Sequence, residues 1–352
     1  MAKIDINVPY EVSAKQVLED TDNRKIIPLT LSADIGLSGG IPLGGTVLFG
    51  GRPKSGKTTM ILQWIANAQK LYGVEAFFFP VEGRLTGQTM KQVRGLNTDA
   101  LKVVRPPPIE DKSGKVIGYH KWNAQQWWKA IGDKIVNNPG SIIIVDSLSA
   151  LSSEKEQSEG MGYQGRGDTQ KLEAQFCRMY GDLIIPNNVT LILIAQVQAN
   201  TSGYGPPLQI KAGNSIGHQA DVKLFCKSFT KWKENSDGKV LGQDVHLTVE
   251  TSAFGAPFID VDVPLRYGYG IDNIKDVITN AINWDIIKAT GAWYQLPFIE
   301  QDGKLVYAET IPSDAKVLKI QGEQEVWNVL SNPKNTEAFA TLESKVRNLV
   351  LG

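Results

Sequence analysis

The sequence predicts an α/β protein whose core is a mainly parallel β-sheet flanked by helices. Short runs that are apolar at every position recur between residues 46 and 195 and alternate with stretches of helical spacing, which is typical of parallel strands buried on both faces. A glycine-rich loop joins the first of these strands to a helix. A short N-terminal segment (residues 1–35) and a small α+β C-terminal domain (residues 272–352) are expected to flank the core (residues 36–271).

The composition indicates an ordinary globular protein and argues against a secreted or membrane-spanning one. The chain has 352 residues, of which 42% are hydrophobic and 21% charged, as in ordinary globular proteins. It carries 37 basic and 37 acidic residues, so any site for a polyanion must be a local patch. Its two cysteines, Cys177 and Cys226, have apolar neighbours and are expected to be buried thiols. Without a signal peptide or an apolar run of membrane-spanning length, we expect a cytoplasmic protein with no membrane partner.

The first strand, residues 46–49, leads directly into the glycine loop. Residues 51–58 match G-x-x-x-x-G-K-[ST] at every fixed position, and apolar residues at helical spacing follow. Backbone N–H groups of such a loop converge on phosphate oxygens, Lys57 would neutralise the β and γ phosphates, and the Thr58 hydroxyl would bind Mg²⁺. The alternative is a chance glycine loop before a helix. The candidate nucleotide-binding residues of the loop are Gly51, Arg52, Pro53, Lys54, Ser55, Gly56, Lys57, Thr58 and Thr59.

The next three strands each end at a polar side chain. The apolar runs over 74–81, 141–145 and 190–195 are followed by Glu82, Asp146 and Gln196 respectively. Parallel sheets bind ligands beyond the carboxyl ends of their strands, so these three residues are expected on the same edge as the glycine loop.

Their chemistry suits nucleotide hydrolysis. Asp146 would hold Mg²⁺ partly through water, and Glu82 would orient and deprotonate an attacking water. Gln196 would sense the γ-phosphate and pass its state to the following loop. Each residue has a structural alternative: Asp146 as a helix cap, Glu82 as a solvated strand end, and Gln196 as a plain polar strand end. The predicted cofactors are ATP and Mg²⁺.

The segments between the strands are uneven. Residues 105–121 contain three consecutive prolines and a turn, and are expected to form an exposed excursion. The three tryptophans that follow (Trp122, Trp127 and Trp128) fit a helix that covers the sheet, with base stacking as the alternative.

Two long glycine-containing stretches, residues 152–169 and 198–214, are expected to be functional loops without regular structure. Beyond Asp221 the pattern becomes β-rich, with strands expected over 222–229 and 245–251.

Several motifs resemble those of the RecA recombinases, including their phage UvsX-type relatives, over nearly the whole chain. The general ATPase motifs are the glycine loop and the three strand ends described above. The recombinase branch is favoured by three further groups, which are Gly255-Ala256-Pro257-Phe258, Tyr267-Gly268-Tyr269-Gly270-Ile271 and Gly291-Ala292-Trp293-Tyr294.

The resemblance implies a RecA-type P-loop ATPase core and a DNA-dependent ATPase. The protein would form homo-oligomeric helical filaments on single-stranded DNA, pair it with double-stranded DNA and exchange strands in recombination and repair, with help from a loader or single-strand-binding protein. Glu82, Lys57 and Gln196 would be its catalytic residues. Its DNA-contacting residues would lie in the two loops: Gly162, Tyr163, Arg166, Gln198, Asn200, Tyr204, Lys211, Gly213 and Asn214.

The chain departs from the family pattern in four respects. Thr251 and Ala253 stand where family members carry two lysines that reach a neighbour's ATP, and residues 105–121 have no obvious counterpart. The N-terminal segment is a candidate oligomerisation arm but is short compared with the long oligomerisation helix of bacterial members, and the acidic tail common in those members is not expected here. These differences indicate a divergent, phage-encoded member. Two other functions stay open: a hexameric, helicase-like motor, and a non-catalytic paralogue that modulates filaments.

Overall fold

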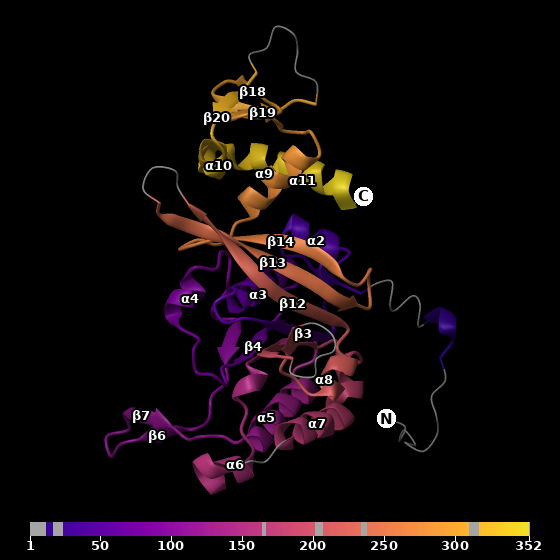
Figure 1. The fold of residues 1–352 in the computed structure, drawn as a ribbon, viewed down its shortest axis with the longest axis vertical. Helices are drawn as coiled ribbons and strands as arrows, with labels where there is room; N and C mark the ends of the chain where they lie inside the picture. Colours follow the sequence, from indigo (N-terminus) through magenta and orange to yellow (C-terminus); the bar gives the residue numbers. More distant parts are fainter. Residues whose placement is uncertain are drawn as a thin grey trace, which may run out of the picture.

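A mixed β-sheet forms the centre of the protein, whose computed structural model describes residues 12–16, 24–163, 167–200, 207–233, 238–309 and 317–351. Within these residues the sheet has nine strands in the order β15-β14-β13-β12-β3-β9-β8-β4-β5 (Figure 1). All neighbouring pairs from β12 to β5 are parallel, whereas those from β12 to β15 are antiparallel. The strands are β3 (Gly45–Gly51), β4 (Ala76–Phe79), β5 (Leu101–Val103), β8 (Ile142–Asp146), β9 (Thr190–Ala195), β12 (Val222–Lys233), β13 (Val240–Ser252), β14 (Ile259–Arg266) and β15 (Gly270–Ile271).

Helices cover both faces of the parallel half of the sheet, as the sequence predicts. Alternate residues of β3 belong to different cores: Phe49 packs with Trp64 of α3, and Leu48 packs with the cluster that contains Trp127 and Trp128 of α5. Trp127 and Trp128 therefore cover the sheet from a helix as predicted, whereas Trp122 precedes α5 and is only partly buried against the same cluster. The helices of this part are α2 (Leu31–Gly36), α3 (Lys57–Tyr72), α4 (Gly87–Lys91), α5 (Ala124–Asn137), α6 (Glu154–Glu159), α7 (Asp168–Ile184) and α8 (Asn214–Gln219), with 3₁₀ turns η1 (Leu148–Ala150) and η2 (Gly160–Gly162).

Local sequence explains where the two long sheet-covering helices begin and end. α3 starts after Gly56 and stops at Gly73, and both glycines adopt the left-handed conformation that other residues resist. α5 begins with a capping box, in which the Asn123 side chain accepts from the Gln126 N–H while the Gln126 side chain accepts from the Asn123 N–H.

The chain between strands is more ordered than the sequence predicts. Residues 105–121 form an exposed hairpin, β6 (Pro108–Glu110) with β7 (Val116–Tyr119), which agrees with the expected excursion. The expectation of two loops without regular structure is wrong, however. The first contains α6 and η2, and the second contains a hairpin of β10 (Val197–Ala199) with β11 (Leu208–Ile210). A further pair, β1 (Ile26–Ile27) with β2 (Ile41–Pro42), lies near the N-terminus.

A separate hydrophobic core holds the C-terminal elements together at one end of the molecule (Figure 1). Leu31 of α2 joins this core, so the N-terminal segment packs against the C-terminal elements as well as the sheet. The elements are α9 (Asn273–Asn283), β16 (Lys288–Thr290), β17 (Trp293–Gln295), β18 (Phe298–Gln301), β19 (Lys304–Tyr307), β20 (Lys319–Gln321), α10 (Glu323–Ser331), η3 (Pro333–Asn335) and α11 (Thr336–Leu351).

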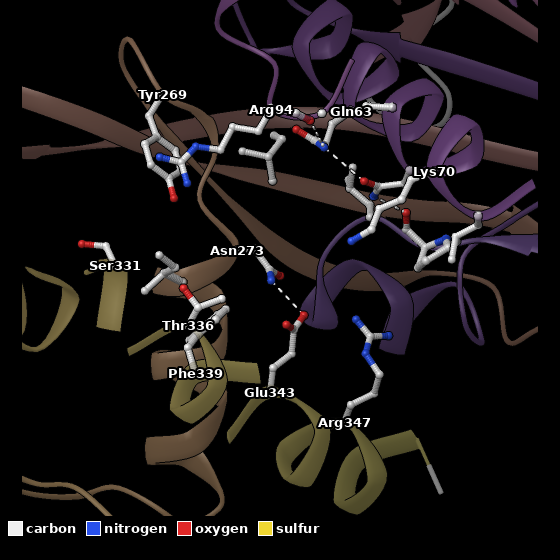
Figure 2. Close-up of a pocket in the computed structure, with 18 of the residues that line it drawn as sticks. Gln63, Lys70, Arg94, Tyr269, Asn273, Ser331, Thr336, Phe339, Glu343 and Arg347 are labelled. Atoms are coloured by element: carbon white, nitrogen blue, oxygen red, sulfur yellow. Dashed lines mark hydrogen bonds between the residues drawn. The ribbon is translucent and has the colours of Figure 1, made fainter. Parts of the chain in front are cut away.

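Polar contacts complete the junction between the two ends of the chain. The Arg347 guanidinium of α11 donates to the buried Asp34 carboxylate of α2 at 2.9 Å. Beside this pair lies a cavity of about 540 Å³ between α3 and the C-terminal helices, in which Asn273 donates to Glu343 and Arg94 stacks on Tyr269 (Figure 2).

Two further expectations have simple outcomes. Cys226 is buried, but Cys177 is only half-buried, so the prediction of two buried thiols is half correct. Among the described residues, no helix combines the length and the apolar character needed to cross a bilayer.

Candidate active site

The glycine loop after β3 is shaped by close contacts that only glycine permits. A Cβ atom on Gly51 would lie 2.6 Å from the Cβ of Cys226, and one on Gly56 would lie 2.8 Å from Cδ1 of Leu265. Gly56 also has a φ of 85° and precedes the first residue of α3. The two fixed glycines of the motif therefore let the loop turn tightly against β12 and β14.

Lys57 is buried within the loop that precedes it. Its Nζ donates to the backbone carbonyls of Gly51 at 2.9 Å and Arg52 at 2.7 Å, with Ser55 Oγ at 3.4 Å. Burial lowers the pKa of Lys57 from its ordinary value, and the nearby Asp146 and Glu82 carboxylates oppose that shift. An incoming anion would find this ammonium group already positioned at the base of the loop.

The beginning of α3 provides the remaining phosphate-binding groups. Gly56 caps the helix without a side chain, so no side-chain oxygen occupies the N–H donors of the first turn. These donors, the helix dipole and Lys57 together fit the phosphates of a nucleoside triphosphate. Thr58 Oγ1 lies 3.0 Å from Asp146 Oδ2, a hydroxyl and a carboxylate of the kind that bind Mg²⁺ beside phosphates.

Asp146 and Glu82 end adjacent strands and are joined through the backbone. The Glu82 N–H donates to the Asp146 carbonyl at 3.0 Å. Burial is the main cause of the raised pKa of Asp146, and the hydrogen bond from Thr58 opposes it. Because Mg²⁺ binding requires the ionised carboxylate, a cation at this position would reverse the shift. Within the described chain, no cluster of three or more metal-binding side chains occurs, so a cation here would rely on phosphate oxygens as well.

Gln196 connects the strand ends to the hairpin that follows. Its side-chain amide donates to Glu82 Oε1 at 2.7 Å, and its backbone N–H donates to Ser149 Oγ at 2.9 Å. Its backbone carbonyl accepts from the N–H of Lys211, the first residue after β11, at 2.7 Å. One residue therefore contacts both the Glu82 carboxylate and the base of the β10–β11 hairpin.

Other residues that line the site are not found by sequence reasoning. Ser147 Oγ donates to Glu82 Oε1, and Arg84 Nε lies 3.5 Å from Glu82 Oε2. Tyr267 Oη donates to Gln243 at 2.8 Å on the opposite wall, which β13 and β14 supply. These side chains and the predicted residues surround one cavity of about 520 Å³. The strand-end pattern explains Ser147 and Arg84, which neighbour predicted residues, but no local pattern marks Gln243 or Tyr267 as part of a nucleotide site.

The residues predicted to contact DNA lie on two elements beyond this edge. Gly162 and Tyr163 close η2, and the Tyr163 hydroxyl donates to Asp168 at 2.5 Å, which raises the pKa of Tyr163 to about 12. Gln198 lies in β10 opposite Gln209, and the Asn200 N–H donates to Pro207. Lys211 and Asn214 are exposed beside the hairpin, whereas Arg166 and Tyr204 lie outside the described residues.

Gly213 differs from the expectation for a DNA-contacting residue. It is buried, and its N–H donates to the carboxylate of Glu173 on α7 at 2.5 Å. Burial raises the pKa of Glu173 to about 7, although this hydrogen bond opposes the shift. Gly213 therefore anchors the end of the hairpin segment to α7 and has no free N–H for a ligand.

Comparisons with known proteins identify the family of the chain. A family model described as the RecA N-terminal domain matches residues 15–272, a range that includes the glycine loop, the three strand ends and Tyr267. Protein RecA of Dichelobacter nodosus is 30% identical over 268 residues, which cover 76% of this chain and 71% of that protein. Protein RecA of Methylococcus capsulatus is 30% identical over 273 residues, covering 76% and 73% respectively. Protein RecA of Citrifermentans bemidjiense is 28% identical over 268 residues, covering 75% and 73%.

Proposed function

This chain belongs to the RecA family of recombinases, ATPases that act in DNA recombination and repair, and we propose that it is a DNA-dependent ATPase forming helical filaments on single-stranded DNA. Bound ATP would stabilise the filament, and homology with double-stranded DNA would be read by base pairing between the strands. Hydrolysis would weaken the filament and release the product. A loader or single-strand-binding protein would assist assembly.

The position of Gln196 is the observation that carries this proposal. Its side-chain amide donates to the candidate base Glu82 at 2.7 Å, and its backbone carbonyl accepts from the N–H of Lys211, directly after the β10–β11 hairpin. The contact of the hairpin with DNA and the attack on phosphate at Glu82 would therefore both involve Gln196. Such a shared residue makes the affinity for DNA and the affinity for ATP a coupled equilibrium.

The residues of the loop would bind and orient ATP. Lys57 would exchange its bonds to the carbonyls of Gly51 and Arg52 for phosphate oxygens, and the first N–H groups of α3 would donate to the same phosphates. Thr58 and Asp146 would hold Mg²⁺, which when bound neutralises charge on the β and γ phosphates.

Glu82 would act as the general base. Its carboxylate is oriented by donors from Gln196 and Ser147, which keep one oxygen fixed. The carboxylate would accept a proton from an attacking water, while Gln196 would turn from Glu82 towards the γ-phosphate when that phosphate is present. Turning would pull on the Lys211 end of the hairpin and alter its contact with DNA.

The internal departures from the family pattern, at Thr251, at Ala253 and over residues 105–121, support the proposal of a divergent, phage-encoded member. Thr251 lies in β13 opposite Lys223, whose ammonium group pairs with Glu250 at 2.8 Å, so this lysine is already engaged. Ala253 brings no charge. We propose that contact between the ATP sites of neighbouring subunits here relies on groups other than the two lysines of the family.

The decisive experiment measures ATP hydrolysis with and without single-stranded DNA, together with negative-stain microscopy in a non-hydrolysable ATP analogue. We expect turnover to rise severalfold or more with DNA, and open helical filaments to form. Closed rings would instead support a hexameric motor. Binding of ATP without DNA-stimulated turnover would support a non-catalytic modulator, and either result would refute the proposal.

A further inference from the structure

The β6–β7 hairpin extends away from the sheet and carries unburied apolar side chains. Figure 1 shows it as an arm that projects at the lower left of the molecule. Ile117 is 65% exposed and Tyr119 is 48% exposed, and Ile109 and Val116 are also exposed. Because these side chains are exposed, they are available to a ligand. An isolated two-stranded hairpin is only marginally stable in water, so a partner that packs on it would stabilise it.

The arm is nevertheless well defined. Asp111 closes its turn by accepting from the Ser113 hydroxyl at 2.6 Å, the Lys115 N–H at 3.0 Å and the Ser113 N–H at 2.8 Å. These bonds, that from the hydroxyl first, lower the pKa of Asp111. Three consecutive prolines, residues 106–108, fix the backbone where the chain enters the first strand. The side chains of the arm are therefore presented on a preformed backbone.

The arm carries an excess of positive charge, although the net charge of the whole chain is zero. Residues 105–121 contain the cations Arg105, Lys112, Lys115 and Lys121 against the anions Glu110 and Asp111. In the described part of the chain, none of these four cations forms an ion pair with a carboxylate. Unpaired cations in a local patch are the feature that a protein of zero net charge needs to attract a polyanion.

Aromatic side chains lie among these cations at the base of the arm. A hollow of about 430 Å³ is lined by Arg105, Tyr119, His120, Lys121 and Trp122. The Arg105 guanidinium lies 5.4 Å from the centre of the Tyr119 ring, and Trp122 packs edge-on against Trp127 at 4.9 Å. Cations that track phosphates beside rings that stack on bases are the features of sites for single-stranded nucleic acid.

The hollow touches both functional parts of the protein. Residues Pro80, Val81 and Gly83, which flank the candidate base Glu82, form one wall. On the other side, the Trp122 carbonyl accepts from Gln157 of α6 at 3.1 Å, and the Ala124 N–H donates to Ser152 at 2.7 Å. The hollow thus lies between the end of β4 and the first predicted DNA loop.

From these observations we infer that the hollow at the base of the β6–β7 arm is an additional binding site for single-stranded DNA. Arg105 and Lys121 contact two backbone phosphates, and Tyr119 stacks on a base. Binding is independent of sequence because every base has a face that can stack. This inference rests on the proposed DNA-dependent function and adds a contact surface outside the two predicted loops.

The larger cavity in Figure 2 is a weaker candidate for this ligand. Two of its three lining cations, Arg94 and Arg347, and the Asn273 amide already have partners within the protein, as described above, and its Glu343 carboxylate would repel phosphate. The hollow at the arm contains no carboxylate among its lining residues.

The test compares DNA binding by full-length variants, using fluorescence anisotropy with labelled oligo-deoxythymidine at several salt concentrations. Arg105→Ala/Lys121→Ala should weaken binding about 10-fold or more and reduce the slope of log K against log salt by about 1.4, or about 0.7 for each lost phosphate contact. Tyr119→Ala should weaken binding at least about fivefold, whereas Tyr119→Phe should bind like wild type because the ring remains.

A charge-matched control separates this site from general electrostatics. Lys129→Ala/Lys345→Ala removes two exposed cations that are already paired with Asp133 and Glu309, and should leave the salt slope unchanged. A photoreactive iodouracil oligonucleotide should cross-link to the peptide that contains Tyr119, which mass spectrometry would locate. Thermal melting confirms that each variant is folded.

Several results would overturn the inference. Unchanged affinity and slope in the arm variants, or cross-links confined to other segments, would refute it even if wild type shows DNA-stimulated ATP hydrolysis. Altered sedimentation of the DNA-free protein with unchanged DNA affinity would assign the arm to protein contact instead. If wild type neither binds DNA nor responds to it, the proposed function fails first and the inference fails with it.

Discussion

Glu82 has more side-chain partners than a solvated strand end requires. Gln196 and Ser147 donate to one carboxylate oxygen, and Arg84 lies near the other. This arrangement fixes the carboxylate and leaves its second oxygen accessible from the cavity that also contains Lys57. The residue is therefore positioned for chemistry, and its role can be separated from its structure by an isosteric substitution.

Glu82→Gln should retain nucleotide binding but lose about 10²- to 10⁴-fold in the rate of hydrolysis, because an amide cannot accept the proton of water. Single-turnover hydrolysis and fluorescent nucleotide binding would measure the two effects. Glu75→Gln provides the control, since Glu75 is exposed and directly precedes β4, at the end of the strand away from Glu82. Equal rates for Glu82→Gln and wild type would exclude Glu82 as the base.

At the residue scale, sequence predicts the half of the site that parallel strands build. Asp146 and Gln196 could be identified because they stand at the ends of buried strands, and parallel strand ends meet at one edge. Lys57 could be identified from the glycine-loop motif that follows the first of these strands. Gln243 and Tyr267 could not, because they come from antiparallel strands. Which face these strands present to the loop depends on the pairing of β12 with β3, two segments far apart in the sequence, and this pairing leaves no local pattern.

At the scale of elements, the strand of the glycine loop directly contacts the hairpin predicted to bind DNA. A Cβ on Gly50 in β3 would lie 2.3 Å from Cγ1 of Ile210 in β11. Absence of a side chain at Gly50 therefore lets the hairpin pack onto the end of β3. The sequence did not predict this hairpin because its strands have three residues each, too few to show an alternating pattern.

Gly50→Ala should destabilise the protein by about 1–3 kcal/mol and reduce stimulation of hydrolysis by DNA, because Ile210 must move. Adding Ile210→Ala makes room for the new methyl group, so the double variant should be more stable than the sum of the single effects. Chemical denaturation of all four proteins measures the coupling. Strict additivity would show that the hairpin does not press on β3.

At the scale of the whole molecule, buried carboxylates join the N-terminal segment to the C-terminal elements. Asp34 accepts from the Leu29 N–H at 2.7 Å and from Arg347, and Asp276 of α9 accepts from the Ser32 N–H at 3.0 Å. Burial raises the pKa of Asp34 to about 7 and that of Asp276 to about 6. Both groups therefore bind protons more tightly in the folded than in the unfolded protein.

This difference predicts the direction of a pH effect. Since the folded-state pKa of Asp34 lies above its unfolded value, its contribution favours folding at low pH and is lost as pH rises towards and through about 7. Between pH 5 and pH 8, wild type should lose about 2 kcal/mol of stability relative to Asp34→Asn, which cannot titrate. Denaturant unfolding across this range measures the difference. A constant difference between the two proteins would show that Asp34 does not titrate there.

The order of the central sheet also has a consequence for synthesis of the chain. β3, which leads into the glycine loop, pairs with β9 and β12, both more than a hundred residues further along the sequence. During translation at about 5–20 residues per second, β3 waits roughly 10 s to over half a minute before Cys226, the last residue that pairs with it, is made. The nascent chain thus holds a buried central strand on the ribosome without its full set of partners, and nucleotide cannot assist folding until nearly two-thirds of the protein exists.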